Sequence, residues 1–278
     1  MDLINSGAVI TGGASGIGFG IARALGKRGV RVILADIEGE RAHASARVLN
    51  DEGIDAAGVA HDVISEESWQ NLADEAFGRW GKVDLLFNNA GVGGGSTVHE
   101  TPTRIWDWVF AVDVRGIFLG VRAFAPVMLE SKHKGRIVNT ASEHALGLPP
   151  RGRGGIVAPY TAAKHAVMGY TLAMRRDFEG TNLSAAIICP GLVQSDVWDS
   201  FRNRHPQFGG PRRAPPAAGA AMRVGLPADV AGERIADQIE TDRFFIFTNG
   251  PDESEVSDAY IEEVQAALAT FRASPQRD

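Results

Sequence analysis

A glycine-rich turn near the N-terminus constrains the fold of this chain more than any other feature. The segment TGGASGIG at residues 11–18 follows a short apolar run and opens a segment with helical periodicity. Small residues at such a turn let the backbone approach a pyrophosphate, which sits at the helix N-terminus. Glycine-rich turns are common, but this strand–turn–helix context predicts a dinucleotide site. Its expected contacts are Gly12, Ser15, Gly16, Ile17 and Gly18.

Strand-like and helix-like segments then alternate along the chain. The expected strands cover residues 8–11, 31–35, 56–60, 83–88, 136–140, 184–189 and 243–248. The expected helices cover residues 16–28, 38–52, 66–80, 104–131, 160–179 and 255–273. Such alternation is typical of a parallel sheet with helices on both faces. We therefore predict an α/β fold, a doubly wound Rossmann-type sheet of about seven strands, in a single domain over residues 1–278.

The composition argues against several classes of protein. The formal net charge of -6 disfavours a general nucleic-acid or anionic-membrane surface. No apolar run approaches the roughly 20 residues of a membrane span, and the N-terminus lacks a signal-peptide pattern, so we expect a cytoplasmic protein. The single cysteine, Cys189, excludes an internal disulfide and is expected to pack at the end of a buried strand. No group of residues has metal-ligand spacing, so no catalytic metal is predicted.

Two acidic residues follow the second and third expected strands. Asp36 stands 18 positions after Gly18, where a carboxylate can accept hydrogen bonds from an adenosine ribose and repel a 2′-phosphate. Because no Arg or Lys directly follows Asp36, we predict NAD rather than NADP, with Ile37 beside the coenzyme. A helix N-cap is the alternative role of Asp36. Asp62 is expected to accept from the adenine amino group with Val63 against the ring; an ordinary loop-end Asp is the alternative.

The fourth expected strand ends in Asn88, Asn89, Ala90 and Gly91. Ligands of open α/β sheets bind beyond the carboxyl ends of the strands. We therefore place Asn89, Ala90 and Gly91 at the edge of the coenzyme site. Of the two asparagines, Asn88 is expected to make the closer contact and Asn89 to have the more structural role.

A tyrosine and a lysine further along the chain supply acid–base chemistry. Tyr160 and Lys164 are four residues apart, so on a helix the phenol and the ammonium lie on one face. A fixed positive charge favours phenolate and lowers the pKa of Tyr160. A phenol can then act as acid or base near neutral pH. Together with the upstream turn, this pair predicts a nicotinamide-dependent oxidoreductase.

Taken in order, these motifs resemble the short-chain dehydrogenase/reductase family over about residues 3–248. The matching pieces are Thr-Gly-x-x-x-Gly-x-Gly at 11–18, Asn-Asn-Ala-Gly at 88–91, Ser142, Tyr-x-x-x-Lys at 160–164 and Pro-Gly at 190–191. The resemblance implies that Tyr160 exchanges the hydroxyl proton, Ser142 hydrogen-bonds the substrate oxygen, and Lys164 binds the nicotinamide ribose. It also implies a set of contacts to the rest of the nicotinamide end. These are Pro190, Gly191, Val193 and Ser195.

One residue departs from the family pattern. The family usually places an Asn in the long helix, where it supports a water that bridges to the Lys in a proton relay. Here that position is Asp113, which can still accept from water and is expected to serve in the relay. As an anion it is expected to raise the pKa of Lys164 and to weaken the help given to the phenolate. The relay should therefore survive with altered pH dependence.

Two segments lack regular periodicity. Ser142 and Tyr160 are 18 residues apart, more than the usual family gap, and the extra residues fall near 149–155 with Arg151 and Arg153. Residues 199–225, rich in Pro, Gly and Arg, are expected to form a substrate lid. The arginines of both segments are interpreted as solvated loop charges or as anion-binding groups. Those of the lid are Arg202, Arg204, Arg212 and Arg213.

The predicted function is NAD-dependent interconversion of a secondary alcohol and a ketone, without nucleic-acid or membrane partners. The lid and residues 243–251 loosely resemble members that act on bulky aryl or alicyclic alcohols. A 3-oxoacyl or hydroxysteroid substrate is the alternative. Hypotheses of other classes are a non-catalytic NAD(H)-sensing protein and an isomerase or epimerase with bound NAD. The resemblance also implies a homodimer or homotetramer built on the helices near 104–131 and 160–179, and residues 250–278 form a C-terminal extension.

Overall fold

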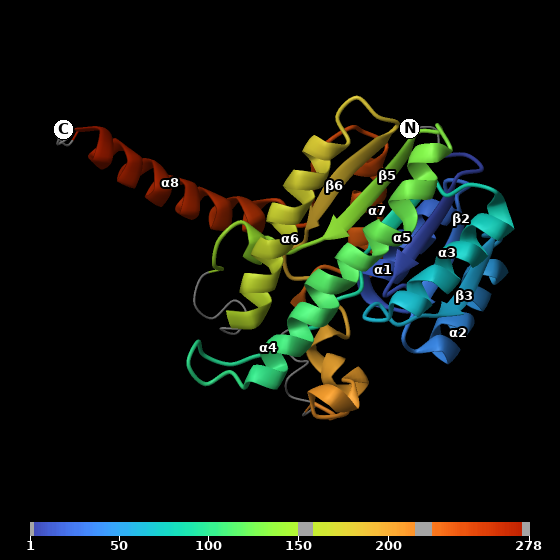
Figure 1. The fold of residues 1–278 in the computed structure, drawn as a ribbon, viewed down its shortest axis with the longest axis horizontal. Helices are drawn as coiled ribbons and strands as arrows, with labels where there is room; N and C mark the ends of the chain where they lie inside the picture. Colours follow the sequence, from blue (N-terminus) through green and yellow to red (C-terminus); the bar gives the residue numbers. More distant parts are fainter. Residues whose placement is uncertain (1–2, 150–157, 215–223, 274–278) are drawn as a thin grey trace.

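A parallel β-sheet forms the centre of the computed structural model (Figure 1), which describes residues 3–149, 158–214 and 224–273. Within these residues the sheet has seven strands in the order β3-β2-β1-β4-β5-β6-β7. They are β1 (Gly7–Thr11), β2 (Arg31–Asp36), β3 (Ala56–Ala60), β4 (Leu85–Asn88), β5 (Gly135–Thr140), β6 (Leu183–Cys189) and β7 (Phe245–Phe247). The predicted doubly wound α/β fold is therefore confirmed, with every expected strand present.

The middle strands are buried along their whole length. Every residue of β1, β4 and β5 is buried, as expected for parallel strands covered on both faces. From β1 the chain adds β2 and β3 on one side, and from β4 it adds strands on the other. The connections therefore diverge between β1 and β4. In open α/β sheets, ligands bind outside the carboxyl ends of the strands at such a switch point.

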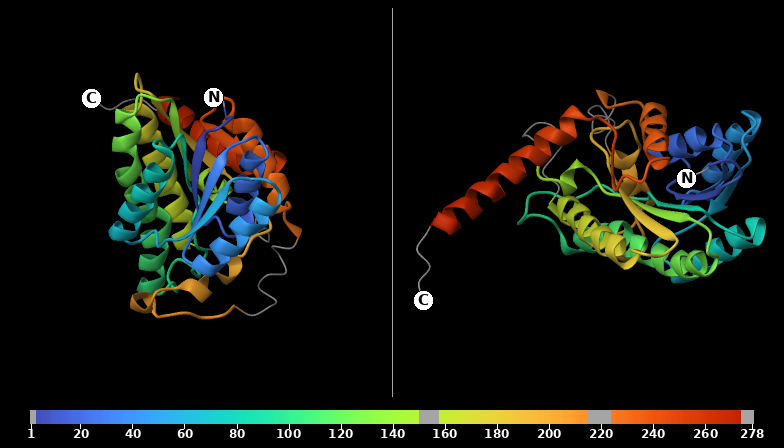
Figure 2. Two further views of the ribbon diagram at one scale, coloured as in Figure 1. Left: turned by 90° about the vertical axis from the view of Figure 1, so that its right-hand side faces the viewer. Right: turned by 90° about the horizontal axis from the view of Figure 1, so that it is seen from above.

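Two layers of helices enclose the sheet (Figures 1 and 2). The layer on one face consists of α1 (Gly16–Gly26), α2 (Gly39–Asp51) and α7 (Ala228–Ile239). The layer on the other face consists of α3 (Glu66–Trp80), α5 (Gly116–Glu130) and α6 (Ala158–Asp177). Each layer buries its own apolar core against the sheet, with Ile21 and Leu25 in the first and Trp69 and Phe124 in the second. The free cysteine, Cys189, is fully buried in the second core, as predicted.

The long helix expected at residues 104–131 is interrupted. It consists of α4 (Thr103–Phe110), a π-helical turn (Ala111–Arg115) and α5. The backbone on either side of the turn keeps right-handed helical dihedral angles, so the axis continues while the register of side chains shifts. Such turns are rare and are found frequently at functional sites. Asp113 lies in the middle of this one.

The C-terminal extension is a helix that leaves the body of the molecule. Helix α8 (Pro251–Ala273) projects away from the sheet in both figures. Its first turn is anchored because Glu253 and Val256 are each 2% exposed. The carboxylate of Glu253 accepts hydrogen bonds from the N–H groups of Thr248 at 3.0 Å and Asn249 at 2.8 Å. The helix therefore begins at Pro251, four residues before the start at residue 255 that the sequence pattern predicted.

The predicted lid follows β6. Its described part, residues 199–214 with 224 and 225, contains most of a 3₁₀ segment (Val197–Asn203) and all of a second short turn (Pro206–Phe208). Phe201 of this segment packs against Trp108 of α4, with ring centres 4.9 Å apart. Ser200 exchanges hydrogen bonds with both backbone groups of Gly93, at 3.2 and 3.1 Å. The segment is therefore fixed to α4 and to the loop after β4 by packing and by hydrogen bonds.

Candidate active site

A cleft of about 670 Å³ opens at the carboxyl ends of the strands. Residues that follow β1 to β6, together with residues of α6, line it. Among the residues predicted from the sequence to bind coenzyme or to act in catalysis, all line this cleft except Gly18, Asn88 and Asp113. Those three lie behind the lining, and their contacts explain why.

The glycine turn between β1 and α1 has no room for side chains at its glycine positions. Gly12 and Gly16 have positive φ angles of 62° and 54°, a region that favours glycine. A Cβ added to Gly12 would lie 2.9 Å from the backbone of Ala90, and one added to Gly16 would lie 3.0 Å from the side chain of Ser195. At Gly18 a Cβ would lie 2.2 Å from the carbonyl oxygen of Gly12, so Gly18 allows close helix packing. The turn therefore fits a dinucleotide pyrophosphate.

Asp36 ends β2 with both carboxylate oxygens oriented by the backbone. One oxygen accepts from the N–H of Ala14 at 3.1 Å and the other from the N–H of Glu38 at 3.0 Å. The N-cap position of α2 belongs to Glu38, so the alternative cap role is not the role of Asp36. Asp36 and Ile37 both line the cleft, at the place where a carboxylate can accept from ribose hydroxyl groups.

The two asparagines at the end of β4 are arranged in the opposite way to that predicted. Asn88 is 2% exposed, does not line the cleft, and donates to the side-chain oxygen of Asn139 at 2.9 Å. Asn89 does line it and donates to the carbonyl oxygen of Thr11 at 3.0 Å. The expectation that Asn88 makes the closer contact is wrong, because strand alternation turns its side chain toward Gly120 of α5.

Ser142, Tyr160 and Lys164 converge in the wall of the cleft. Ser142 follows β5, and its hydroxyl hydrogen-bonds to the Tyr160 phenol. The same hydroxyl accepts from the backbone N–H of His144 at 3.2 Å. Lys164 lies one turn further along α6, with its Nζ 5.3 Å from the centre of the Tyr160 ring. It donates to the carbonyl oxygen of Thr140 at 3.1 Å, which fixes the ammonium beside the phenol.

Asp113 contacts Lys164 directly from the other side. Its Oδ2 lies 3.0 Å from the Nζ of Lys164, and the two side chains are 0% and 4% exposed. Its Oδ1 accepts from the N–H of Val92 at 2.9 Å. The family pattern predicts a water between this position and the lysine, and here the two side chains are in direct contact. The π-helical turn carries the carboxylate to this place below the cleft.

The charges in this cluster oppose one another. Burial raises the pKa of Tyr160, Lys164 lowers it, and Asp113 raises it, with a net upward shift. Burial acts to lower the pKa of Lys164, but Asp113 and Tyr160 raise it, and here too the net shift is upward. The predicted lowering of the Tyr160 pKa by Lys164 is therefore outweighed. The predicted effect of Asp113 on Lys164 has the expected sign, and Lys164 remains charged near neutral pH.

The two residues after Ser142 also belong to the lining of the cleft. The ring of His144 lies edge-on to Tyr160, with centres 5.4 Å apart, and its Nδ1 is 2.8 Å from the hydroxyl oxygen of Thr161. Burial lowers the pKa of His144 to about 4, so this imidazole is neutral near pH 7. The backbone N–H of Glu143 donates to the carbonyl oxygen of Pro190 at 2.8 Å, which joins the loops after β5 and β6.

The loop after β6 forms part of the wall of the cleft. The N–H of Gly191 donates to the Glu253 carboxylate at 3.1 Å, so the first turn of α8 supports this loop. Val193 pairs with Leu226 in an isolated parallel bridge. The sequence contains no signal for the role of Glu253, because the residue lies 62 positions from its partner.

The arginines of the two irregular segments differ in their contacts and in whether the structure describes them. Arg151 and Arg153 lie outside the described residues. Arg202 binds a carboxylate that follows β2, Arg204 donates to two backbone carbonyl groups of the lid, and Arg213 binds a carboxylate within the lid. These three lid arginines are therefore engaged with protein groups, and the contact of Arg202 crosses the cleft.

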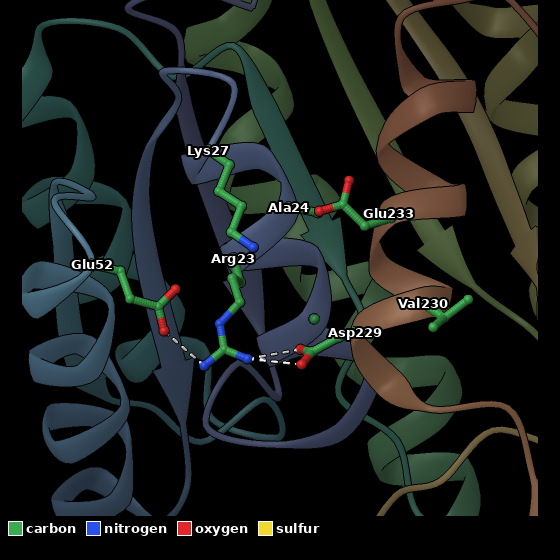
Figure 3. Close-up of a pocket in the computed structure, with 8 residues that line it drawn as sticks. Arg23, Ala24, Lys27, Glu52, Asp229, Val230 and Glu233 are labelled. Carbon is green, nitrogen blue, oxygen red and sulfur yellow. Dashed lines mark hydrogen bonds and ion pairs between the residues drawn. The ribbon is translucent and has the colours of Figure 1, made fainter.

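A second cavity, of about 460 Å³, lies between α1 and α7 (Figure 3). Arg23 extends along it and lies 2.9 Å from Asp229 and 2.9 Å from Glu52. The two helices approach closely because a Cβ on Gly20 or Gly232 would lie 2.3 or 2.2 Å from the opposite backbone. Both terminal nitrogens of the guanidinium pair with carboxylates, and its buried Nε has no hydrogen-bond partner among the described residues.

Among the residues that the structure describes, no three His, Cys, Asp or Glu side chains are grouped as a metal ion requires. In the same part of the chain, no helix has both the length and the apolar character needed to cross a bilayer.

The chemistry of the cleft follows from its two ends. A backbone cradle at one end accommodates a pyrophosphate, and a phenol beside a fixed ammonium at the other can exchange a proton with an alcohol. This fold and this site define an oxidoreductase that uses a nicotinamide dinucleotide. Residues 6–206 match the family model of the short chain dehydrogenases, and the chain belongs to that family.

Characterised relatives support the same class. The chain is 33% identical over 262 residues to a 1-deoxy-11-beta-hydroxypentalenate dehydrogenase of Streptomyces avermitilis, covering 94% of this chain and 90% of that protein. A short chain dehydrogenase/reductase of Burkholderia phymatum, solved in complex with NAD, is 32% identical with a TM-score of 0.85 and covers 100% of this chain and 99% of its own. An actinorhodin polyketide ketoreductase solved with NADPH is 34% identical with a TM-score of 0.64, over 70% of this chain and 74% of that one.

Proposed function

We propose that the protein is an NAD-dependent oxidoreductase that interconverts a secondary alcohol and a ketone by hydride transfer. The observation that carries this proposal is the convergence of Ser142, Tyr160 and Lys164 in the cleft that also contains the glycine cradle. The dehydrogenase from Streptomyces avermitilis, whose name denotes action on a hydroxy compound, supports the reaction class.

Ser142, Tyr160 and Lys164 have different tasks in the proton transfer. When bound, the nicotinamide supplies the hydride acceptor or donor. In the oxidative direction Ser142 holds the substrate oxygen and Tyr160, as phenolate, accepts its proton. Lys164 stabilises that phenolate because Asp113 keeps the ammonium charged. In the reductive direction the phenol donates its proton to the ketone oxygen.

NAD rather than NADP is favoured by the charges at the end of β2. Asp36 lines the cleft at the end of β2, and a carboxylate there would repel the 2′-phosphate of NADP. Two arginines near this rim are already paired, Arg202 with Glu38 at 2.5 Å and Arg41 with Asp196 at 2.6 Å. The coenzyme-binding set proposed here is the one predicted from the sequence, with Gly18 as a packing residue.

A bulky aryl or alicyclic substrate is supported by the substrate end of the cleft. Aromatic rings from α4 and from the 3₁₀ segment after β6 line it, namely Trp108, Trp198 and Phe201. The neutral imidazole of His144 adds one polar group beside Tyr160. The alternatives are a 3-oxoacyl or hydroxysteroid substrate. A panel of aryl, alicyclic, steroid and 3-hydroxyacyl alcohols, assayed by NADH formation with NAD+ and with NADP+, separates them.

A non-catalytic NAD(H)-sensing protein is the second candidate function. One observation favours it, since Asp113 opposes formation of the Tyr160 phenolate. The Tyr160→Phe variant separates the two proposals. Turnover of at least one alcohol that is lost in this variant supports the enzyme, whereas tight NADH binding without turnover of any alcohol supports the sensor.

We also propose that the chain forms a homodimer or homotetramer through α5 and α6. These helices expose Phe118, Val127 and Leu172, three large apolar side chains, on the outside of one layer. The molar mass in solution tests this assembly. The Leu172→Arg variant should shift the mass toward that of the monomer. A monomeric mass for the native protein would contradict the proposed assembly.

A further inference from the structure

The chain that follows β6 reaches the opposite half of the sheet. Residues 196–205, here called the bridging segment, leave the sheet after β6 and contact residues that follow β2 and β3. Strands β1, β4 and β5 lie between β2 and β6. At the usual spacing of neighbouring strands, the distance from β2 to β6 is roughly 19 Å. The bridging segment therefore spans the mouth of the cleft.

Its strongest contact is a two-point ion pair. The Nε and Nη2 of Arg202 lie 3.3 and 2.5 Å from the two carboxylate oxygens of Glu38. Parallel contacts of this kind fix the orientation of both groups. The Arg202 side chain is only 11% exposed, and its Nη1 also donates to the carbonyl oxygens of Asp196 and Asp199. Arg202 thus ties the bridging segment to the loop after β2.

A second ion pair and a histidine–carboxylate contact follow the same path. Arg41 of α2 lies 2.6 Å from Asp196, and its other terminal nitrogen lies 3.5 Å from Glu38. His205 lies 3.0 Å from Asp62, the acidic residue after β3. The partners on the far side of the cleft are therefore the loops after β2 and β3. These loops also carry Asp36, Ile37 and Val63, which line the cleft at the proposed adenosine end.

The same short segment also reaches the substrate end. Ser200 is hydrogen-bonded to Gly93, and Phe201 packs on Trp108. Arg202, the next residue, points to the coenzyme side. One continuous segment therefore contacts both halves of the cleft. The sequence predicted a lid over the substrate and did not predict contacts at the coenzyme half.

We propose that the bridging segment is a coenzyme clasp, in which Asp196, Arg202 and His205 close the adenosine half of the cleft through Arg41, Glu38 and Asp62. This inference rests on the proposed nicotinamide coenzyme and extends it. Release of the coenzyme then requires these contacts between the bridging segment and the loops after β2 and β3 to separate, so they set its dissociation rate. The five side chains around Arg202 act as positioning residues and do not touch the reacting atoms.

The test is the dissociation rate of NADH, measured by stopped-flow fluorescence when excess NAD+ displaces it. Arg202→Gln should release NADH about fivefold faster, which corresponds to about 1 kcal/mol, the upper range for exposed pairs. Glu38→Gln should have the same effect. The charge-exchanged pair Glu38→Arg with Arg202→Glu should restore much of the native rate, because the two-point attraction is rebuilt.

Arg213→Gln is the matched control. Arg213 is an arginine of the same lid, but it pairs with Asp199 within the lid and does not cross the cleft. Its loss should leave NADH release unchanged. Raising salt from about 0.05 to about 0.5 M should speed release from the native protein and have less effect on Arg202→Gln.

Each outcome decides between defined alternatives. Native release rates in Arg202→Gln and Glu38→Gln overturn the clasp, and so does an equal acceleration in Arg213→Gln, which would indicate general loosening of the lid. Failure of the native protein to bind NADH overturns the proposed coenzyme and the clasp with it. Binding of NADH with turnover that is lost only in Tyr160→Phe supports the proposed function whatever the release rates are.

Discussion

Removal of the positive charge of Lys164 should destabilise the folded protein even without coenzyme or substrate. Lys164 and Asp113 are 4% and 0% exposed and lie 3.0 Å apart. Methionine keeps the length of the lysine stem, so Lys164→Met leaves the Asp113 carboxylate buried without its counter-charge. Loss of one partner of a buried ion pair costs about 3–5 kcal/mol. For a chain of this size, the corresponding fall in Tm is roughly 6–20 °C.

The assay is urea and thermal unfolding of four coenzyme-free proteins. These are the native chain, Lys164→Met, Asp113→Asn and the double variant. The double variant has no buried charge at this site, so it should recover about 2 kcal/mol or more of the stability lost in Lys164→Met. If the two single losses simply add in the double variant, the reasoning is refuted, because the pair would then have no coupling.

The pH dependence gives an independent check on the same prediction. Burial raises the pKa of Asp113, and Lys164 opposes that shift. Without Lys164 the pKa of Asp113 rises further. A carboxyl with a raised pKa in the folded state contributes stability that is present at low pH and is lost as pH rises through that pKa. The penalty of Lys164→Met should therefore be smaller near about pH 5 than near about pH 8.

Three other variants or conditions have defined outcomes. Tyr160→Phe should lower kcat by about 10²–10⁴-fold while NADH binding, followed by fluorescence titration, stays close to native. Asp36→Ala should move the kcat/KM ratio of NADP+ to NAD+ upward by about tenfold or more, since the carboxylate that repels a 2′-phosphate is gone; an unchanged ratio would place the discrimination elsewhere. Burial lowers the pKa of His61 and of His144 to about 4 each. Because the unfolded chain binds these protons below about pH 6.5, the free energy of unfolding should fall between about pH 6.5 and about pH 4, and a flat urea-unfolding series over that window would contradict the shifts.

Local sequence patterns predicted the sheet and most of the cleft. Each middle strand is a short apolar run that ends at a polar residue, and the parallel arrangement brings those ends together. Asp36, Ser142 and Ser195 could therefore be placed at one edge from sequence order alone, and the structure has all three in the cleft lining. Spacing along a single helix likewise put Tyr160 and Lys164 on one face.

Features that depend on contacts between distant segments could not be predicted. Periodicity does not reveal one extra residue in a helix, so the π-helical turn within residues 104–131 was missed. The direction of side chains near a strand end is ambiguous by one position. The sequence therefore assigned the closer cleft contact to Asn88, whereas Asn89 lines the cleft. The pair between Glu38 and Arg202 joins residues 164 positions apart, and no local pattern indicates such a contact.

The π-helical turn has a consequence for how this chain can tolerate changes of length. Each residue of an α-helix rotates the chain by about 100°. Deletion of one residue from the turn (Ala111–Arg115) would restore a plain α-helix and rotate α5 relative to α4 by that angle. Either Trp108 would leave the lid or Phe124 would leave the core. Homologous chains with a shorter helix here would therefore need a different lid, so the length of this helix and the sequence of the lid should change together during evolution.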